Sequence, residues 1–93
     1  MKAIWNDIVI TESEKTIQVG GNHYFPPESI KKEYFHKSNN TSRYIWKGKA
    51  NYLSVTVNDK TNPDCAWFYP KPSFLVKKIA GYIAFWNGVK INN

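Results

Sequence analysis

Short runs of β-branched and aromatic residues, each followed by a turn signal, recur along the chain and restrict it to an antiparallel β fold. The strongest turn signal is Asn87-Gly88, because an Asn-Gly pair supplies both positive φ values of a type I′ turn. Two hairpins are therefore expected: Ala3–Ile10 with its turn at Asn6-Asp7, and Gly81–Ile91 with its turn at Asn87-Gly88.

Two further strands are predicted from their apolar patterns. Thr16–Val19 alternates polar and apolar residues, as a half-buried strand does, and Gly20-Gly21 ends it. Asp64–Tyr69 is apolar on both faces, which predicts a central strand. A turn at Asn58–Lys60 leads to this strand, and Asp64 at its start is expected to cap a turn at Asn62-Pro63.

The stretch Arg43–Val57 is β-prone, but a perfectly regular strand would place Lys47 and Lys49 on the same face as its apolar residues. A β-bulge or bend near Gly48 would shift the register by one residue and remove this conflict. The core face would then carry Tyr44, Trp46, Leu53, Val55 and Val57.

Helices are expected to be minor. Pro27 suits a first helical turn, which predicts a short helix over Pro27–Tyr34, ended by a loop at Ser38–Thr41. Ser73–Lys78 is expected to form a helical turn. The predicted fold is mainly β, with compact twisted antiparallel sheets that form a sandwich or a partly open barrel. Its 93 residues make one domain, residues 1–93.

The charge balance favours anionic ligands. Thirteen Lys and Arg against seven Asp and Glu give a net charge of +6, which attracts anions in general. Arg43 is the sole arginine, and arginine is the usual reader of base edges, so nucleic acid is a disfavoured partner. A solvated basic surface explains the same charges without any ligand.

Other classes of protein are also disfavoured. No apolar run approaches the roughly 18 residues of a membrane helix, and the start of the chain does not read as a signal peptide, so a cytoplasmic protein without membrane contact is expected. Cys65 is the only cysteine and lies in an apolar run, where burial makes a thiol inert. With two His and one Cys, no metal site and no cofactor are predicted.

Polar and aromatic residues gather in three segments: Asn22–Pro26, Arg43–Gly48 and Asp64–Pro70. A folded sheet could bring these segments together as one groove. The candidate ligand-binding residues are Asn22, His23, Tyr24, Arg43, Trp46, Lys47, Asp64, Trp67 and Tyr69. Each type also has an ordinary structural role, since the turn polar groups can bond backbone, the aromatics can fill the core and the lysines can be solvated.

The same segments resemble a bacterial family, domain of unknown function 427, nearly end to end. The matching motifs are Gly21–Pro26, Trp46–Gly48 with Ala50 and Tyr52, Asp64 and Ala66-Trp67 with Tyr69-Pro70, and Gly81-Tyr82 with Ala84-Phe85. The resemblance implies a twisted β fold of the Mss4-like or β-tent type. Family members often have Cys-Pro before the Trp-Lys-Gly motif, whereas Tyr44-Ile45 stand here. The family's nucleotidyltransferase label lacks its chemical basis, because Asp64 has no paired acidic residue for metal ions.

Three hypotheses of function remain open. The leading one is a non-catalytic module that binds a small anionic or ring-bearing ligand in the groove of the three segments. The second is an enzyme with His23 as general base, Asp64 as its orienting partner and Lys47 stabilising negative charge. The third is a structural or protein-interaction domain whose exposed aromatic residues pair with another chain. Both a monomer and a homodimer are compatible with the sequence.

Overall fold

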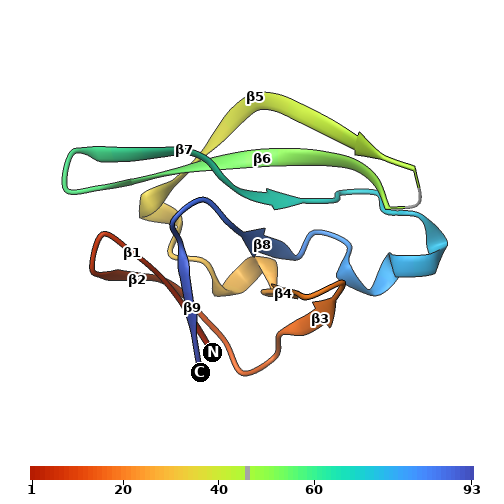
Figure 1. Ribbon diagram of the computed structural model, residues 1–93, viewed down its shortest axis with the longest axis horizontal. Coiled ribbons are helices and arrows are strands. Elements are labelled where there is room, and N and C mark those ends of the chain that lie inside the picture. Colours follow the sequence, from red (N-terminus) through yellow and green to blue (C-terminus); the bar gives the residue numbers. More distant parts are fainter. Residues whose placement is uncertain (46) are drawn as a thin grey trace.

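The computed structural model describes residues 1–45 and 47–93, and this part of the chain forms three antiparallel sheets (Figure 1). The mainly β fold is confirmed, and the helices are short 3₁₀ segments. Within the described residues the sheets do not close into a barrel. In chain order the elements are β1 Lys2–Trp5, β2 Ile8–Glu12, β3 Ile17–Val19, β4 Asn22–Tyr24, η1 Pro27–Ser29, η2 Lys32–Tyr34, β5 Phe35–Tyr44, β6 Gly48–Val57, β7 Lys60–Phe68, η3 Phe74–Ile79, β8 Ile83–Phe85 and β9 Lys90–Asn92.

The N-terminal sheet has the order β2-β1-β9. The predicted hairpin of β1 and β2 is confirmed, and Asn6 and Asp7 both adopt positive φ, 52° and 62°, in its turn. The Asn6 side chain donates a hydrogen bond to the carbonyl oxygen of Val57 at 3.1 Å, which ties this turn to β6. The third strand of this sheet, β9, comes from the C-terminal part of the sequence and pairs antiparallel with β1.

The Asn87-Gly88 turn forms, with φ values of 54° and 93°, but the hairpin predicted around it is wrong. β8 pairs with β7 in the large sheet, whereas β9 pairs with β1 in the N-terminal sheet. Contacts with β7 fix the turn in place, because the Asn62 side chain donates to the Asn87 carbonyl oxygen at 2.8 Å. The dipeptide determined the local backbone, and tertiary pairing determined the partner of each strand.

The large sheet has the order β5-β6-β7-β8. Two backbone hydrogen bonds of 2.8 Å between Phe25 and Ile83 extend it to the small hairpin of β3 and β4. The turn of that hairpin is Gly20-Gly21, so the chain continues in a strand, β4, that the sequence did not predict. β7 lies between β6 and β8, which confirms the central strand expected from its two apolar faces.

The helix predicted over Pro27–Tyr34 is wrong, because two separate 3₁₀ turns occupy this stretch. Ile30 between them is extended, with φ −78° and ψ 146°. The Lys31 N–H donates to the carbonyl oxygen of Ile10 at 2.9 Å, and Ile30 forms a bridge with Thr11 of β2. Pairing with the N-terminal sheet therefore replaces the helical hydrogen bonds.

The loop predicted at Ser38–Thr41 is also wrong, since β5 continues through it and pairs with β6. The register of this pairing shifts between Lys37 and Thr41, so the polar residues mark an irregularity within a strand. The predicted helical turn after Ser73 is confirmed as η3, Phe74–Ile79.

No bulge occurs at Gly48, where the chain instead completes a reversal and β6 begins. Gly48 has φ 112°, and a Cβ at this position would lie 3.2 Å from the carbonyl oxygen of Lys71. The bulge lies opposite Leu53–Val55, at Asp64, which has φ 55° in the middle of β7. Asp64 therefore does not begin the strand or cap a turn at Asn62-Pro63, because β7 begins at Lys60.

The expected core face of Arg43–Val57 is only partly confirmed. Leu53, Val55 and Val57 are buried, whereas Tyr44 is half exposed. Trp46 lies outside the described residues.

The large sheet has two contrasting faces. Its inner face packs phenylalanine and aliphatic side chains, among them Phe25, Leu53 and Phe85, against the N-terminal sheet. Its opposite face, which we call the tyrosine face, carries Tyr24 and Tyr69 and is partly covered by η3. The register places Tyr52, Trp67, Ala84 and Tyr24 in one row on the tyrosine face. No helix in residues 1–45 or 47–93 has the length and apolar character needed to cross a bilayer.

Candidate functional site

The candidate site is a pocket of about 270 Å³ on the tyrosine face. It is lined by one amide and four aromatic side chains: Asn22, Tyr44, Tyr52, Trp67 and Trp86. Strand pairing explains why these residues meet. β4, β7 and β6 present Asn22, Trp67 and Tyr52 on one face, and Tyr44 comes from the end of β5 beside the start of β6. Residues far apart in sequence therefore form one aromatic hollow.

Ring contacts hold the pocket walls. The rings of Tyr24 and Trp67 meet edge to face, with centroids 6.3 Å apart and an interplanar angle of 89°. Tyr44 meets Tyr69 in the same manner at 6.3 Å and 74°. Such edge-to-face pairs fix ring orientation beyond what burial alone does. The half-exposed rings of the pocket, Tyr44 at 49% and Trp86 at 53%, remain accessible from solvent.

Hydrogen bonds orient two further walls. The hydroxyl groups of Tyr52 and Ser42 are 2.8 Å apart and share a hydrogen bond. The Trp86 indole N–H donates to the backbone carbonyl oxygen of Asp64 at 2.6 Å, so the bulge in β7 anchors this ring. These contacts leave the ring faces to present apolar surface to the hollow.

The phenols behind the pocket are held neutral. Burial raises the pKa of Tyr24 and that of Tyr69 above their ordinary value. The Tyr24 hydroxyl has no hydrogen-bond partner within the described residues, although Trp67 and Tyr69 lie near it. A neutral phenol in this setting favours stacking and hydrogen bonding over proton transfer near neutral pH.

The predicted site residues divide between the two faces of the sheet. Asn22, Tyr24, Trp67 and Tyr69 lie on the tyrosine face. Successive side chains of a strand point to opposite faces, so His23 faces away from Asn22 and Tyr24, and Arg43 faces away from Tyr44. The groove expected from the sequence therefore does not collect all of its candidates.

Two further candidates, Lys47 and Asp64, do not line the pocket. The Lys47 ammonium nitrogen is 3.5 Å from the position that a Cβ on Gly20 would occupy, which places it beside the turn that leads to Asn22. The Asp64 carboxylate accepts a hydrogen bond from the Asn40 side chain at 2.6 Å, and the hydroxyl of Ser38 also lowers its pKa. Trp46, the remaining candidate, falls on the one residue that the structure does not describe.

The general-base arrangement is not assembled. Among residues 1–45 and 47–93 the His23 imidazole makes no hydrogen bond, and the partners of Asp64 are Asn40 and Ser38. Nor do any three His, Cys, Asp or Glu side chains of this part of the chain gather as a metal-binding group. Burial raises the pKa of the Cys65 thiol to about 11, which keeps it protonated.

Sequence reasoning missed three lining residues: Tyr44 as a site residue, Tyr52 and Trp86. In the β5–β6 hairpin Ser42 pairs with Ala50. Tyr44 and Tyr52 each lie two residues further along their own strand, so they point to the same face of the sheet as this pair. Treating Arg43–Val57 as one bulged strand concealed this signal. Trp86 was assigned to a hairpin that does not form.

Comparison with known proteins places this fold in a family. No curated protein matches the chain. A family model described as domain of unknown function (DUF427) matches residues 1–92, which is nearly the whole chain. The nucleotidyltransferase wording attached to that model is a name and carries no assigned activity. The chain therefore belongs to the DUF427 family.

Proposed function

We propose that this domain is a non-catalytic module that binds a small ring-bearing ligand in the tyrosine-face pocket. The observation that carries the proposal is the lining of this pocket. Asn22, Tyr44 and Trp67 each come from a different one of the three segments singled out in the sequence, and they border one hollow. Aromatic walls with a few placed polar groups are typical of small-molecule sites.

The size and walls of the pocket suit a planar or sugar ring. Its volume of about 270 Å³ is just below the roughly 300 Å³ at which pockets for drug-sized ligands begin. A single ring with small substituents matches this space. Stacking on an aromatic side chain contributes about 1–3 kcal/mol for each ring and tolerates different ring types.

Polar groups at the rim favour a polar or anionic substituent on that ring. Asn22 offers both an amide donor and an acceptor to the pocket. Lys47 lies beside the adjacent Gly20-Gly21 turn, and the net charge of +6 attracts anions to the whole surface. The ligand class supported best is a ring bearing a phosphate or carboxylate group.

Isothermal titration against nucleotides, sugar phosphates and short oligonucleotides tests the proposal. Tyr44→Ala removes a half-exposed wall, and from the stacking energy we expect a loss of affinity of about 5-fold to 150-fold. Phe74→Ala is the matched control, because this aromatic side chain is 81% exposed and lies outside the pocket. The proposal is wrong if no ligand of the panel gives heat, or if both variants weaken binding equally.

Self-association is a second candidate function, favoured by one end of the molecule. Ile45, Phe74 and Leu75 are large apolar residues with exposed side chains. The Ser73 N–H donates to the Lys47 carbonyl oxygen at 3.1 Å, which brings the β5–β6 turn and η3 together there (Figure 1). Light scattering over a range of concentrations tests this: a monomer at the highest concentration argues against it, and a dimer that Phe74→Ser abolishes supports it.

A further inference from the structure

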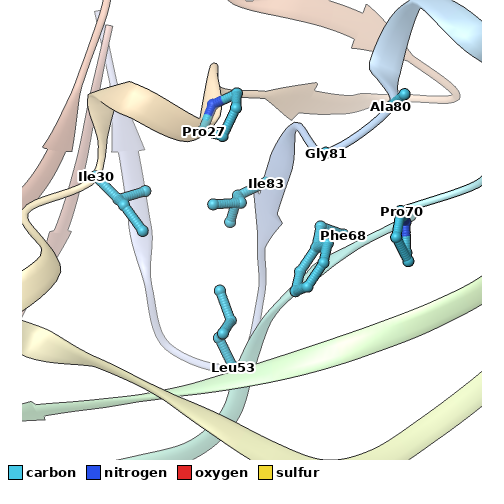
Figure 2. A pocket seen from close by; sticks show the side chains of 8 residues that line it. All are labelled: Pro27, Ile30, Leu53, Phe68, Pro70, Ala80, Gly81 and Ile83. Carbon is cyan, nitrogen blue, oxygen red and sulfur yellow. The ribbon is translucent and has the colours of Figure 1, made fainter.

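An apolar hollow of about 490 Å³ lies on the inner face of the large sheet, away from the tyrosine face. Figure 2 shows Ile30, Leu53 and Phe68 directed from three separate segments of the chain toward a common space, with Pro27 and Ile83 beside it. No charged side chain is among the described residues that line this hollow. It is therefore shaped to hold an aliphatic group.

A polar hollow of about 480 Å³ adjoins the apolar one. Phe68 lines both. Across the strands, Phe68 pairs with Asn51, and Leu53 pairs with Lys37, so residues of the apolar hollow are direct neighbours of residues of the polar hollow. The two hollows thus form one trough across β5, β6, β7 and β8, about 15 Å from the first strand to the last at about 4.8 Å per strand.

Positive charge gathers at the polar end of this trough. Lys37 and Lys49 line it, and Arg43 stands opposite Lys49 in the register and so on the same face. None of the described residues that line either hollow is acidic. Arg43 and Lys49 are direct cross-strand neighbours, whereas Lys37 stands opposite Leu53, four residues along β6 from Lys49. The like charges of Arg43 and Lys49 repel one another, and a bound anion relieves that repulsion.

We infer that this trough binds an amphipathic anion. An unbranched aliphatic tail fills the apolar hollow beside Leu53, Phe68 and Ile83, while a carboxylate or phosphate head lies between Lys37 and Lys49. The negative charge of the head group and the length of the tail determine which ligand binds, because the cationic end and the apolar end belong to one continuous surface. The polar hollow shares Tyr52 with the aromatic pocket, whereas the apolar hollow shares no lining residue with it. The trough is thus defined by its apolar end, and the inference does not depend on the function proposed for the aromatic pocket.

A ligand series tests the inference on the whole chain. Hexanoate, octanoate and decanoate are added below their micelle concentrations. Binding is measured by isothermal titration calorimetry and by the shifts of methyl and indole NMR signals. Affinity is expected to rise about 4-fold for each added methylene until the trough is full. Octyl phosphate should bind as octanoate does, whereas octyl glucoside and octylammonium should bind at least 5-fold more weakly, because they lack the negative charge. Equal binding of all head groups overturns the inference.

Variants locate the two ends. Lys37→Gln with Lys49→Gln should weaken octanoate at least 5-fold and leave octyl glucoside unchanged. The matched control, Lys15→Gln with Lys60→Gln, removes the same charge from exposed positions outside the trough. Ala80→Leu extends an exposed side chain at the apolar hollow and should shorten the tail that binds best.

The site of binding decides between this trough and the aromatic pocket. Methyl signals of Leu53 and Ile83 should shift with octanoate, and the indole signals of Trp67 and Trp86 should not. Tyr44→Ala should leave octanoate binding unchanged. Failure of octanoate to bind, shifts confined to the indoles, or equal weakening by the control pair overturns the inference. The proposal of a ring-bearing ligand is tested independently, by the titrations with Tyr44→Ala and Phe74→Ala.

Discussion

The two faces of the large sheet use aromatic residues in different ways. On the inner face Phe25 and Phe35 meet Phe85 edge to face, and residues of the N-terminal sheet pack in the same core cluster. On the tyrosine face the rings carry hydroxyl or indole N–H groups, and Tyr44 and Trp86 remain half exposed. A phenylalanine gains only from burial, whereas tyrosine and tryptophan suit a boundary that is apolar on one side and wet on the other. Stability is thus concentrated on one face and accessible ring surface on the other.

Cavity variants should separate the faces most strongly. Phe25→Ala removes a fully buried ring of the inner face, and we expect it to lower the free energy of unfolding by about 3–5 kcal/mol. Tyr44→Ala on the tyrosine face should cost about 1 kcal/mol or less, because its ring is already half solvated. Urea unfolding followed by tryptophan fluorescence measures both, and similar losses would show that the comparison is wrong.

The buried thiol of the inner face gives the next effect, a dependence on alkaline pH. Burial raises the pKa of Cys65 from 9.0 to about 11, so the unfolded chain loses this proton first. The thiol's contribution to stability is complete below about pH 8.5 and declines as pH rises to 11, by about 2 kcal/mol. Cys65→Ala is the control, because it has no thiol to ionise. The part of the alkaline loss of stability that the parent protein shows and Cys65→Ala does not is the contribution of the thiol. Parallel pH profiles of the two proteins would contradict the assignment.

On the tyrosine face a smaller change of the opposite sign is expected. The buried Tyr24 hydroxyl has no partner within the described residues, and a buried hydroxyl without a hydrogen bond is destabilising. Tyr24→Phe should therefore raise the free energy of unfolding by about 1 kcal/mol in the same urea experiment. Tyr52→Phe is the matched control and should lower it, because this hydroxyl is hydrogen-bonded to Ser42. A loss of stability in Tyr24→Phe would reveal a partner for the hydroxyl.

The smallest effect concerns the Asp64 carboxylate, which is hydrogen-bonded to Asn40 of β5. Hydrogen bonds from Ser38 and Asn40 lower its pKa, so they stabilise the fold above the ordinary carboxyl pKa and are lost as pH falls through the lowered value. Asn40→Ala should raise the NMR titration midpoint of Asp64 toward its ordinary value. Asn39→Ala, at the neighbouring exposed position, should leave that midpoint where it is.

Some local signals predicted the structure correctly, although the helix over Pro27–Tyr34 and the loop at Ser38–Thr41 were wrong. The turn at Asn6-Asp7 and the central position of β7 followed from residue type and from apolar pattern. Partners distant in sequence did not follow. Asn87-Gly88 makes its turn, yet the strand after it joins β1, because a register is decided by which faces can be buried together. Ile30 could not be placed without knowing that β2 presents an open edge to it.

Of the candidate residues chosen from the sequence, Asn22 and Trp67 line the aromatic pocket and most of the others do not. The three segments do border one pocket, but Asn22, Tyr44 and Trp67 face it, while His23 and Arg43 point to the opposite face. Neighbouring residues of a strand point to opposite faces of the sheet, so the face of each side chain depends on its position in the strand. For β5, that position depends on where the chain reverses before Gly48. That reversal leaves no distinctive signature in a stretch that is β-prone throughout.

The pairing of Lys2 with Asn92 has a consequence for biogenesis. Until β9 leaves the ribosome, one edge of β1 has no neighbour from its own chain, and an open edge invites strand addition by another molecule. Closing a contact between such distant residues also costs entropy and slows the search for the native topology. The N-terminal hairpin can form early, but its sheet is completed late, so β9 sets the moment at which the nascent chain is protected from aggregation.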